Sequence, residues 1–172
     1  MSYFDDLPKI AIDCGCGAGN ESAFLLQQDF RVHAFDSSPQ AREICLQKLA
    51  EHARFTFTLD RFEHYQFPQA SLIIALFSLF FCAPNRLDHV FEQITNALIP
   101  QGIFLFQMLG KEDAWVIRNS EQFIGFECIA LEQKFATEFD ILFIDEFKGD
   151  KPLANGALKF WHLYTLILKQ KP

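Results

Sequence analysis

A short apolar segment, residues 9–12, runs almost directly into three glycines at alternate positions, Gly15, Gly17 and Gly19. Glycine adopts positive φ angles without strain, so this spacing predicts a sharp turn whose backbone can approach a ligand closely. The following segment, 20–28, predicts a helix whose N-terminal amides point toward that ligand and favour an anionic group. Strand, turn and helix together predict the start of an α/β sheet with a ligand site at its carboxyl edge.

Apolar segments alternate with amphipathic ones along the first two thirds of the chain. Segment 71–76 is almost continuously apolar, which is typical of a strand buried on both faces, whereas segment 87–98 has apolar residues at helical spacing. This alternation predicts a parallel sheet covered by helices on both faces. We predict strands at 9–12, 31–35, 54–59, 71–76 and 103–108, and helices at 20–28, 39–49, 87–98 and 129–136.

The last third of the chain has a different pattern. Segments 139–147 and 158–168 are rich in β-forming residues, and about ten polar or turn-forming residues, including Gly149, Pro152 and Gly156, separate them. Two strands joined without an intervening helix pair antiparallel. We therefore predict a terminal hairpin added to the parallel sheet.

Length and charge limit the classes of function. The 172 residues, half of them hydrophobic, predict one folded domain spanning 1–172. Twenty-two acidic residues against 15 basic ones give a net charge of −7, which argues against nucleic acid as a partner.

The cysteines and the apolar runs indicate the compartment. Five cysteines are scattered and odd in number, unlike a secreted disulfide framework. Cys14 and Cys16 have the wrong spacing for zinc, so we predict no metal. The N-terminus lacks the pattern of a signal peptide, and the longest apolar run, about 14 residues, is too short to span a bilayer. We expect a cytoplasmic protein with no membrane partner.

The glycine turn distinguishes between two nucleoside cofactors. A dinucleotide fingerprint has the spacing G-x-G-x-x-G, but here Asn20 stands at the third glycine's place and the glycine is at 19. Asp13 also adds a negative charge before the turn, which disfavours a diphosphate and suits a cationic ligand. The pattern favours S-adenosylmethionine, and NAD-dependent oxidoreduction is the less favoured alternative.

With these features the chain resembles the class I S-adenosylmethionine-dependent methyltransferases. Asp36 ends the second predicted strand, where that family places the carboxylate that binds the ribose hydroxyls. Asp60, followed by Arg61 and Phe62, matches the family's adenine contact, and Phe77 follows the fourth strand, where the family lines its cofactor pocket. The cofactor residues implied are Asp13, Cys14, Gly15, Cys16, Gly17, Gly19, Asp36, Ser37, Asp60, Arg61, Phe62 and Phe77.

The resemblance implies a Rossmann-like three-layer sandwich. Its seven-stranded, mainly parallel sheet has the order 3-2-1-4-5-7-6 and an antiparallel terminal strand. Segment 99–103 looks like the family's turn into the fifth strand, with Gln101 in place of the usual first glycine. Only twelve residues precede Asp13, where members usually have a helical segment, so we expect a shortened N-terminal cap.

Segments 78–84, 106–115 and 159–162 are similar to a small bacterial branch of tellurite-resistance-type and other small-molecule methyltransferases. Ligands of open parallel sheets lie beyond the carboxyl ends of the strands, where these segments fall. We therefore predict that a small acceptor binds to Ser78, Phe80, Phe81, Trp115 and Trp161, with His162 as the candidate general base.

The predicted activity is in-line methyl transfer from S-adenosyl-L-methionine to an unidentified small molecule, releasing S-adenosyl-L-homocysteine. A catalytically inactive cofactor-binding module that acts through a protein partner stays an alternative. A homodimer is compatible with the sequence. The acceptor, and whether transfer needs a base, are left open by the residues alone.

Overall fold

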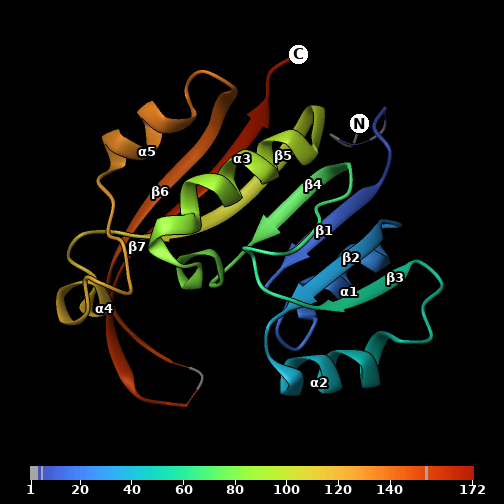
Figure 1. Ribbon diagram of the computed structural model, residues 1–172, viewed down its shortest axis with the longest axis horizontal. Coiled ribbons are helices and arrows are strands. Elements are labelled where there is room, and N and C mark those ends of the chain that lie inside the picture. Colours follow the sequence, from blue (N-terminus) through green and yellow to red (C-terminus); the bar gives the residue numbers. More distant parts are fainter. Residues whose placement is uncertain (1–3, 5, 154) are drawn as a thin grey trace.

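The computed structural model describes residues 4, 6–153 and 155–172, which form one seven-stranded sheet with helices on both faces (Figure 1). The strand order is β3-β2-β1-β4-β5-β7-β6, as the family resemblance implied. β1 to β5 run parallel, and β7 lies antiparallel between β5 and β6. The strands are β1 (Ile10–Cys14), β2 (Arg31–Asp36), β3 (Phe55–Leu59), β4 (Ala70–Ala75), β5 (Leu98–Leu109), β6 (Phe139–Pro152) and β7 (Leu158–Gln170).

Two apolar cores, one on each face of the sheet, define the three layers. On one face α1 and α2 pack against residues such as Val32 and Ile74, and on the other α3 and α5 pack against residues such as Ile73 and Phe106. Strand residues alternate between the two faces, which is why neighbours in sequence belong to different cores. The helices are α1 (Asn20–Gln27), α2 (Pro39–Leu49), α3 (Leu87–Ala97), α4 (Ala114–Arg118) and α5 (Cys128–Phe135), with 3₁₀ turns at η1 (Leu79–Phe81) and η2 (Pro84–Arg86).

The terminal hairpin is longer and tighter than the sequence predicted. β6 continues through Gly149 to Pro152, and only residues 153–157 connect it to β7. The turn closes with hydrogen bonds from Leu153 N–H to Ala157 O (2.8 Å) and from Gly156 N–H to Leu153 O (2.8 Å). The predicted ten-residue loop is wrong because pairing with β7 overrides the turn signals, and β6 is an edge strand, where proline is tolerated.

The predicted turn at 99–103 lies inside a strand. β5 begins directly after α3, and three residues of β4, from Ala70 to Leu72, face six of β5, from Leu98 to Ile103. Gln101 has a φ of 69° within this bulge, a conformation that glycine adopts without strain. Segment 99–103 therefore has the positive φ angle of a turn, but it forms a β-bulge within β5.

Among the described residues, none of the helices combines the length and the apolarity that crossing a membrane requires. The same residues contain no group of three or more histidine, cysteine or acidic side chains placed to hold a metal ion.

Candidate cofactor and acceptor site

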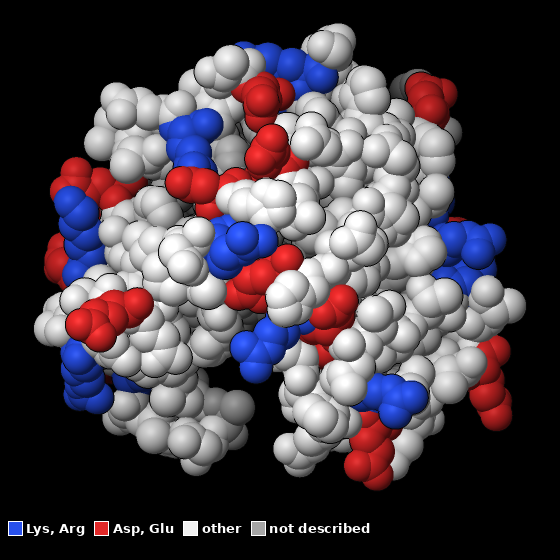
Figure 2. All heavy atoms as spheres, in the orientation of Figure 1, with Lys and Arg blue, Asp and Glu red and all other residues white. Residues whose placement is uncertain are grey.

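A cleft of about 450 Å³ opens at the carboxyl edge of the sheet, between the ends of β1 to β4. Figure 2 shows this edge as an open notch between the β6–β7 hairpin and the half of the sheet that holds β2 and β3. Its volume lies within the usual range for small-molecule sites. The predicted cofactor residues that line it are Gly15, Gly17, Asp36, Ser37, Asp60, Arg61, Phe62 and Phe77, and the remaining lining residues are Phe35, Glu63, Ser78 and Phe81.

The glycine turn has the predicted backbone. Gly15, Gly17 and Gly19 have φ values of 68°, 51° and 73°. The N–H groups of Gly15 and Cys16 both donate to Phe35 O, at 2.8 and 3.0 Å, and so fasten the turn to β2. A Cβ on Gly15 would lie 2.4 Å from Ser78 Cβ, so close packing as well as backbone conformation requires glycine there.

Asp36 links this turn to the start of α2. Its Oδ2 accepts a hydrogen bond from Gly17 N–H (2.9 Å), and its Oδ1 accepts one from Ser38 N–H (2.8 Å). A carboxylate oxygen accepts more than one hydrogen bond, so each oxygen keeps an acceptor position beyond its backbone partner. The side chain is thus held rigidly at the cleft with acceptor capacity for two further donors.

Asp13 does not line the cleft, contrary to the role predicted for its charge. It is buried, and Ser22 Oγ in α1 donates to its Oδ2 at 2.6 Å. Burial raises the pKa of Asp13 to about 7, although the Ser22 hydrogen bond opposes this shift. The carboxyl group therefore supports the turn from within the core, as do Cys14, Cys16 and Gly19, which also lie outside the lining.

Glu63 is a cleft residue that the sequence analysis missed. Its Oε1 accepts a hydrogen bond from Ala83 N–H (2.8 Å), which ties the loop after β3 to the loop after β4. Partial burial raises the pKa of Glu63, but hydrogen bonds from the N–H groups of Ala83 and Glu63 outweigh this and keep it below its usual range. Glu63 follows Asp60 by three residues, and this closeness to a predicted cofactor residue could have indicated that it lies in the cleft.

A second cavity of about 300 Å³ adjoins the cleft and has aromatic walls. Phe77 and Phe81 line both spaces. The ring centroids of Trp115 and Trp161 lie 5.4 Å apart, although α4 supplies the first and β7 the second. The cavity is lined by Phe77, Phe80, Phe81, Trp115, Pro152, Leu153 and Trp161.

The structure thus brings together all the aromatic residues predicted for the acceptor, and Ser78 lies beside them in the cleft. Ser78 also donates from its Oγ to Cys14 O at 2.6 Å, so its hydroxyl proton is engaged by the end of β1. Of the described residues that line the aromatic cavity, none carries a titratable side chain.

Phe77 stands between the two spaces in a strained conformation. Its φ is 50°, which costs a non-glycine residue about 1–2 kcal/mol, and the residue is 55% exposed. Phe77 N–H donates to Gln107 Oε1 (3.1 Å), and Gln107 Nε2 donates to Thr165 Oγ1 (3.1 Å). Gln107 and Thr165 had no sequence signal, because only sheet pairing places them beneath this loop.

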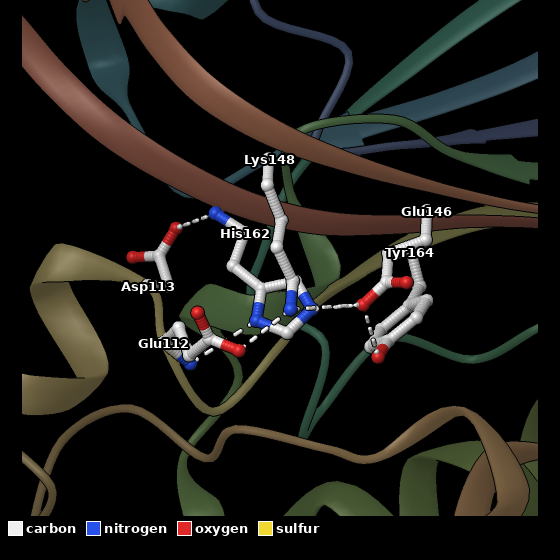
Figure 3. Close-up of polar contacts among 6 residues, drawn as sticks. All are labelled: Glu112, Asp113, Glu146, Lys148, His162 and Tyr164. Atoms are coloured by element: carbon white, nitrogen blue, oxygen red, sulfur yellow. Dashed lines mark hydrogen bonds and ion pairs between the residues drawn. The ribbon is translucent and has the colours of Figure 1, made fainter.

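His162, the candidate general base, is not among the residues that line the aromatic cavity. It is 3% exposed, and it follows Trp161 on β7, so its side chain points to the opposite face of the sheet. Its Nδ1 accepts a hydrogen bond from Glu112 N–H (3.1 Å), which leaves Nε2 to donate to Glu146 Oε1 (2.8 Å) (Figure 3). Tyr164 OH donates to the same oxygen at 2.9 Å.

The strand order, the glycine turn fastened to β2 and the acid at the end of β2 are those of the class I S-adenosylmethionine-dependent methyltransferase fold. The profile of the methyltransferase domain family matches residues 11–102, more than half of the chain. The chain belongs to this family.

Individual relatives differ in their acceptors. The chain is 27% identical over 108 residues to trans-aconitate 2-methyltransferase of Rhodopseudomonas palustris, covering 62% of this chain and 40% of the relative. It is 28% identical over 122 residues to a tRNA N(3)-methylcytidine methyltransferase of Drosophila melanogaster, covering 64% of this chain and 38% of the relative. The chain thus spans about two fifths of the length of these curated relatives.

Two solved structures have the same fold. TehB from Haemophilus influenzae superposes with a TM-score of 0.78 at 18% identity, over 96% of this chain and 59% of TehB. The N-methyltransferase NodS from Bradyrhizobium japonicum, in complex with S-adenosyl-L-homocysteine, superposes with a TM-score of 0.73 at 12% identity, over 95% of this chain and 79% of NodS.

Proposed function

We propose that this protein binds S-adenosylmethionine in the cleft and transfers its methyl group to a small acceptor held in the aromatic cavity. The observation that carries the proposal is Asp36, fixed at the cleft by two backbone donors while both oxygens keep acceptor capacity. When bound, the cofactor supplies the electrophilic methyl group. NodS, whose solved complex contains S-adenosyl-L-homocysteine, supports the assignment of this ligand.

The residues of the cleft fit such a nucleoside. Asp36 would accept from the ribose hydroxyls, and Asp60 would accept from the adenine amino group with the oxygen that Arg61 N–H does not occupy. Gly15 and Gly17 line the cleft with backbone alone, so no side chain at these positions would block the ligand. Asp13, Cys14, Cys16 and Gly19 would support this turn from below.

In the proposed site, the protein contributes mainly by positioning. Phe77 and Phe81 border both spaces, so they would bring donor and acceptor together and exclude water; orientation of this kind accelerates reactions strongly. Ser78, Phe80, Trp115 and Trp161 would complete the acceptor surface. We propose that His162 acts as a positioning residue, because both of its ring nitrogens are engaged on the other face of β7.

The test combines binding with turnover. Calorimetric titration with S-adenosylhomocysteine should show binding by the wild-type protein and a large loss for Asp36→Ala. Release of S-adenosylhomocysteine should then be measured against thiols, amines, phenols, carboxylates, metalloid oxyanions, heteroaromatics and tRNA. Turnover with a small compound supports the proposal, whereas turnover with tRNA alone contradicts a small acceptor.

The inactive module remains the second hypothesis. Cofactor binding without transfer to any acceptor class would favour it, and a protein partner would then be sought. Failure to bind the cofactor contradicts both hypotheses. A homodimer and a cytoplasmic location stay predictions, and the oligomeric state can be measured by light scattering.

A further inference from the structure

A buried ion pair lies against the aromatic cavity, although neither partner lines it. Lys159 on β7 and Asp113 at the start of α4 form this pair, and their side chains are 3% and 0% exposed. Lys159 Nζ lies 3.5 Å from the ring centroid of Trp161 and 4.4 Å from that of Trp115. The ammonium group is therefore the end of the pair that contacts both indole rings.

The carboxylate of Asp113 accepts three hydrogen bonds from the scaffold. Its Oδ2 accepts from Lys159 Nζ and from His162 N–H (3.1 Å), and its Oδ1 accepts from Trp115 N–H (2.9 Å) as the N-cap of α4. These bonds fix α4, and with it Trp115, against β7. On the far side of β7, the His162 ring accepts from Glu112 N–H and so holds the segment before α4 as well.

An internal cation on these rings affects which ligands the cavity can accept. An indole ring attracts a cation through the negative electrostatic potential of its faces. Here Lys159 already uses that potential on both tryptophans. Asp113 neutralises the pair as a whole, but the pair turns its positive end toward the rings and would therefore oppose a second cation bound among them. The described lining residues offer no acidic side chain that would compensate.

From this arrangement we propose that the Lys159–Asp113 pair makes the cavity selective for neutral, planar aromatic acceptors and against cationic ones. This proposal rests on the proposed function for its biological meaning, but the selectivity is a property of the cavity and can be measured without the cofactor. Lys159 acts here as a specificity-determining residue that works through Trp115 and Trp161.

Selectivity for a neutral aromatic acceptor agrees with the absence of a titratable side chain among the described residues that line the cavity. A neutral ring nitrogen attacks with its lone pair, so that a nitrogen–carbon bond forms while the bond between sulfur and the methyl carbon breaks. The sulfur keeps that electron pair, the positive charge passes to the acceptor, and no proton has to be removed. The product is then a cation, which the same rings would bind less tightly than the acceptor.

Quinoline and N-methylquinolinium test this proposal, because they share one ring system and differ by the methyl group and its charge. Trp115 and Trp161 are the two tryptophans of the chain, so quenching of tryptophan fluorescence reports directly on this cavity. We expect quinoline to bind about tenfold more tightly than N-methylquinolinium at neutral pH, with calorimetry as the second readout. Equal or tighter binding of the cation overturns the proposal, as does failure of both probes to bind saturably.

Variants assign the effect to the ion pair. In a Lys159→Met, Asp113→Asn double variant, which keeps an N-cap and leaves no unpaired buried charge, the preference should fall to about onefold. Lys151→Met is the matched control, because the Lys151 ammonium group lies 4.0 Å from the ring centroid of Phe147. Lys151 contacts Trp161 through its backbone carbonyl, which accepts from Trp161 Nε1 (3.3 Å) and which the substitution keeps. If the double variant prefers quinoline over N-methylquinolinium as strongly as the wild type does, the proposal is contradicted. If that variant does not fold, the ratio of the two affinities in the wild type decides alone. Titration with S-adenosylhomocysteine tests the proposed function separately.

Discussion

Replacing Asp13 by asparagine isolates what one buried carboxyl group does to the stability of the fold. Asp13 lies next to the last residue of β1, beneath the glycine turn, and Ser22 is its side-chain hydrogen-bond partner. Burial raises its pKa from an ordinary value of 3.8 to about 7 in the folded protein. The folded state therefore holds the proton more tightly than the unfolded state does.

The sign and size of the effect follow from this difference. Stability from protonated Asp13 is fully present below about pH 4 and is lost as the pH rises through about 7. About three pKa units at 1.36 kcal/mol each give a loss of roughly 4 kcal/mol above neutral pH, as an upper limit. Asparagine cannot ionise, so the free energy of unfolding of the Asp13→Asn variant lacks this pH-dependent contribution.

Urea unfolding of both proteins between about pH 5 and pH 8 measures the difference. We expect the free energy of unfolding of Asp13→Asn, relative to that of the wild type, to rise by about 2–3 kcal/mol between these two pH values. A pH-independent effect of the substitution does not alter this change. Ser22→Ala removes a hydrogen bond that favours the carboxylate, so the pKa of Asp13 should rise further in that variant. Its loss of stability should therefore occur at a higher pH than in the wild type. A difference that is flat with pH would refute a buried carboxyl with a raised pKa.

Three further predictions concern the cleft and its support. Asp36→Ala should weaken S-adenosylhomocysteine binding by about 2–3 kcal/mol in calorimetry, because backbone and ribose donors lose their acceptor. Ser38→Ala is the control: it removes the N-cap of α2, so it should cost about 1 kcal/mol of stability and leave the affinity unchanged. Gly15→Ala should lower both the melting temperature and the affinity, since its Cβ meets Ser78. Gly17→Ala, whose Cβ meets no protein atom within 4 Å, should cost only about 1 kcal/mol of stability in thermal unfolding, but it should also weaken cofactor binding because Gly17 lines the cleft. His162→Asn should lower stability but leave the shape of the pH–rate profile unchanged; loss of a single ionisation from that profile would restore the role of general base.

Much of the fold was predictable because its signals are local. The periodicity of apolar residues located the five parallel strands and the principal helices, although not α4, and the spacing of the glycines predicted a turn with positive φ angles. The absence of a helix between the last two strands predicted their antiparallel pairing. The strand order came from the resemblance to the family, since periodicity carries no information about which strands become neighbours.

The direction of individual side chains was less predictable. Asp13 and His162 were assigned to the site by their distance in sequence from the glycine turn and from Trp161. In the structure Asp13 points into the core, and His162 points to the face opposite Trp161. Adjacent residues of one strand alternate between faces, so His162 cannot share the face of the sheet that Trp161 occupies.

The sequence by itself determined the parts of the site that one strand and its following turn build: the glycine loop, Asp36, Asp60 and the aromatic residues after β4. Tertiary structure alone decided the support, namely the Gln107–Thr165 contact beneath Phe77 and the Lys159–Asp113 pair, whose partners are 58 and 46 residues apart. Local signals arise from backbone propensity and side-chain periodicity within a few turns of chain. A buried polar contact forms between distant residues only after the sheet has paired, because burial is what makes an unpaired partner costly.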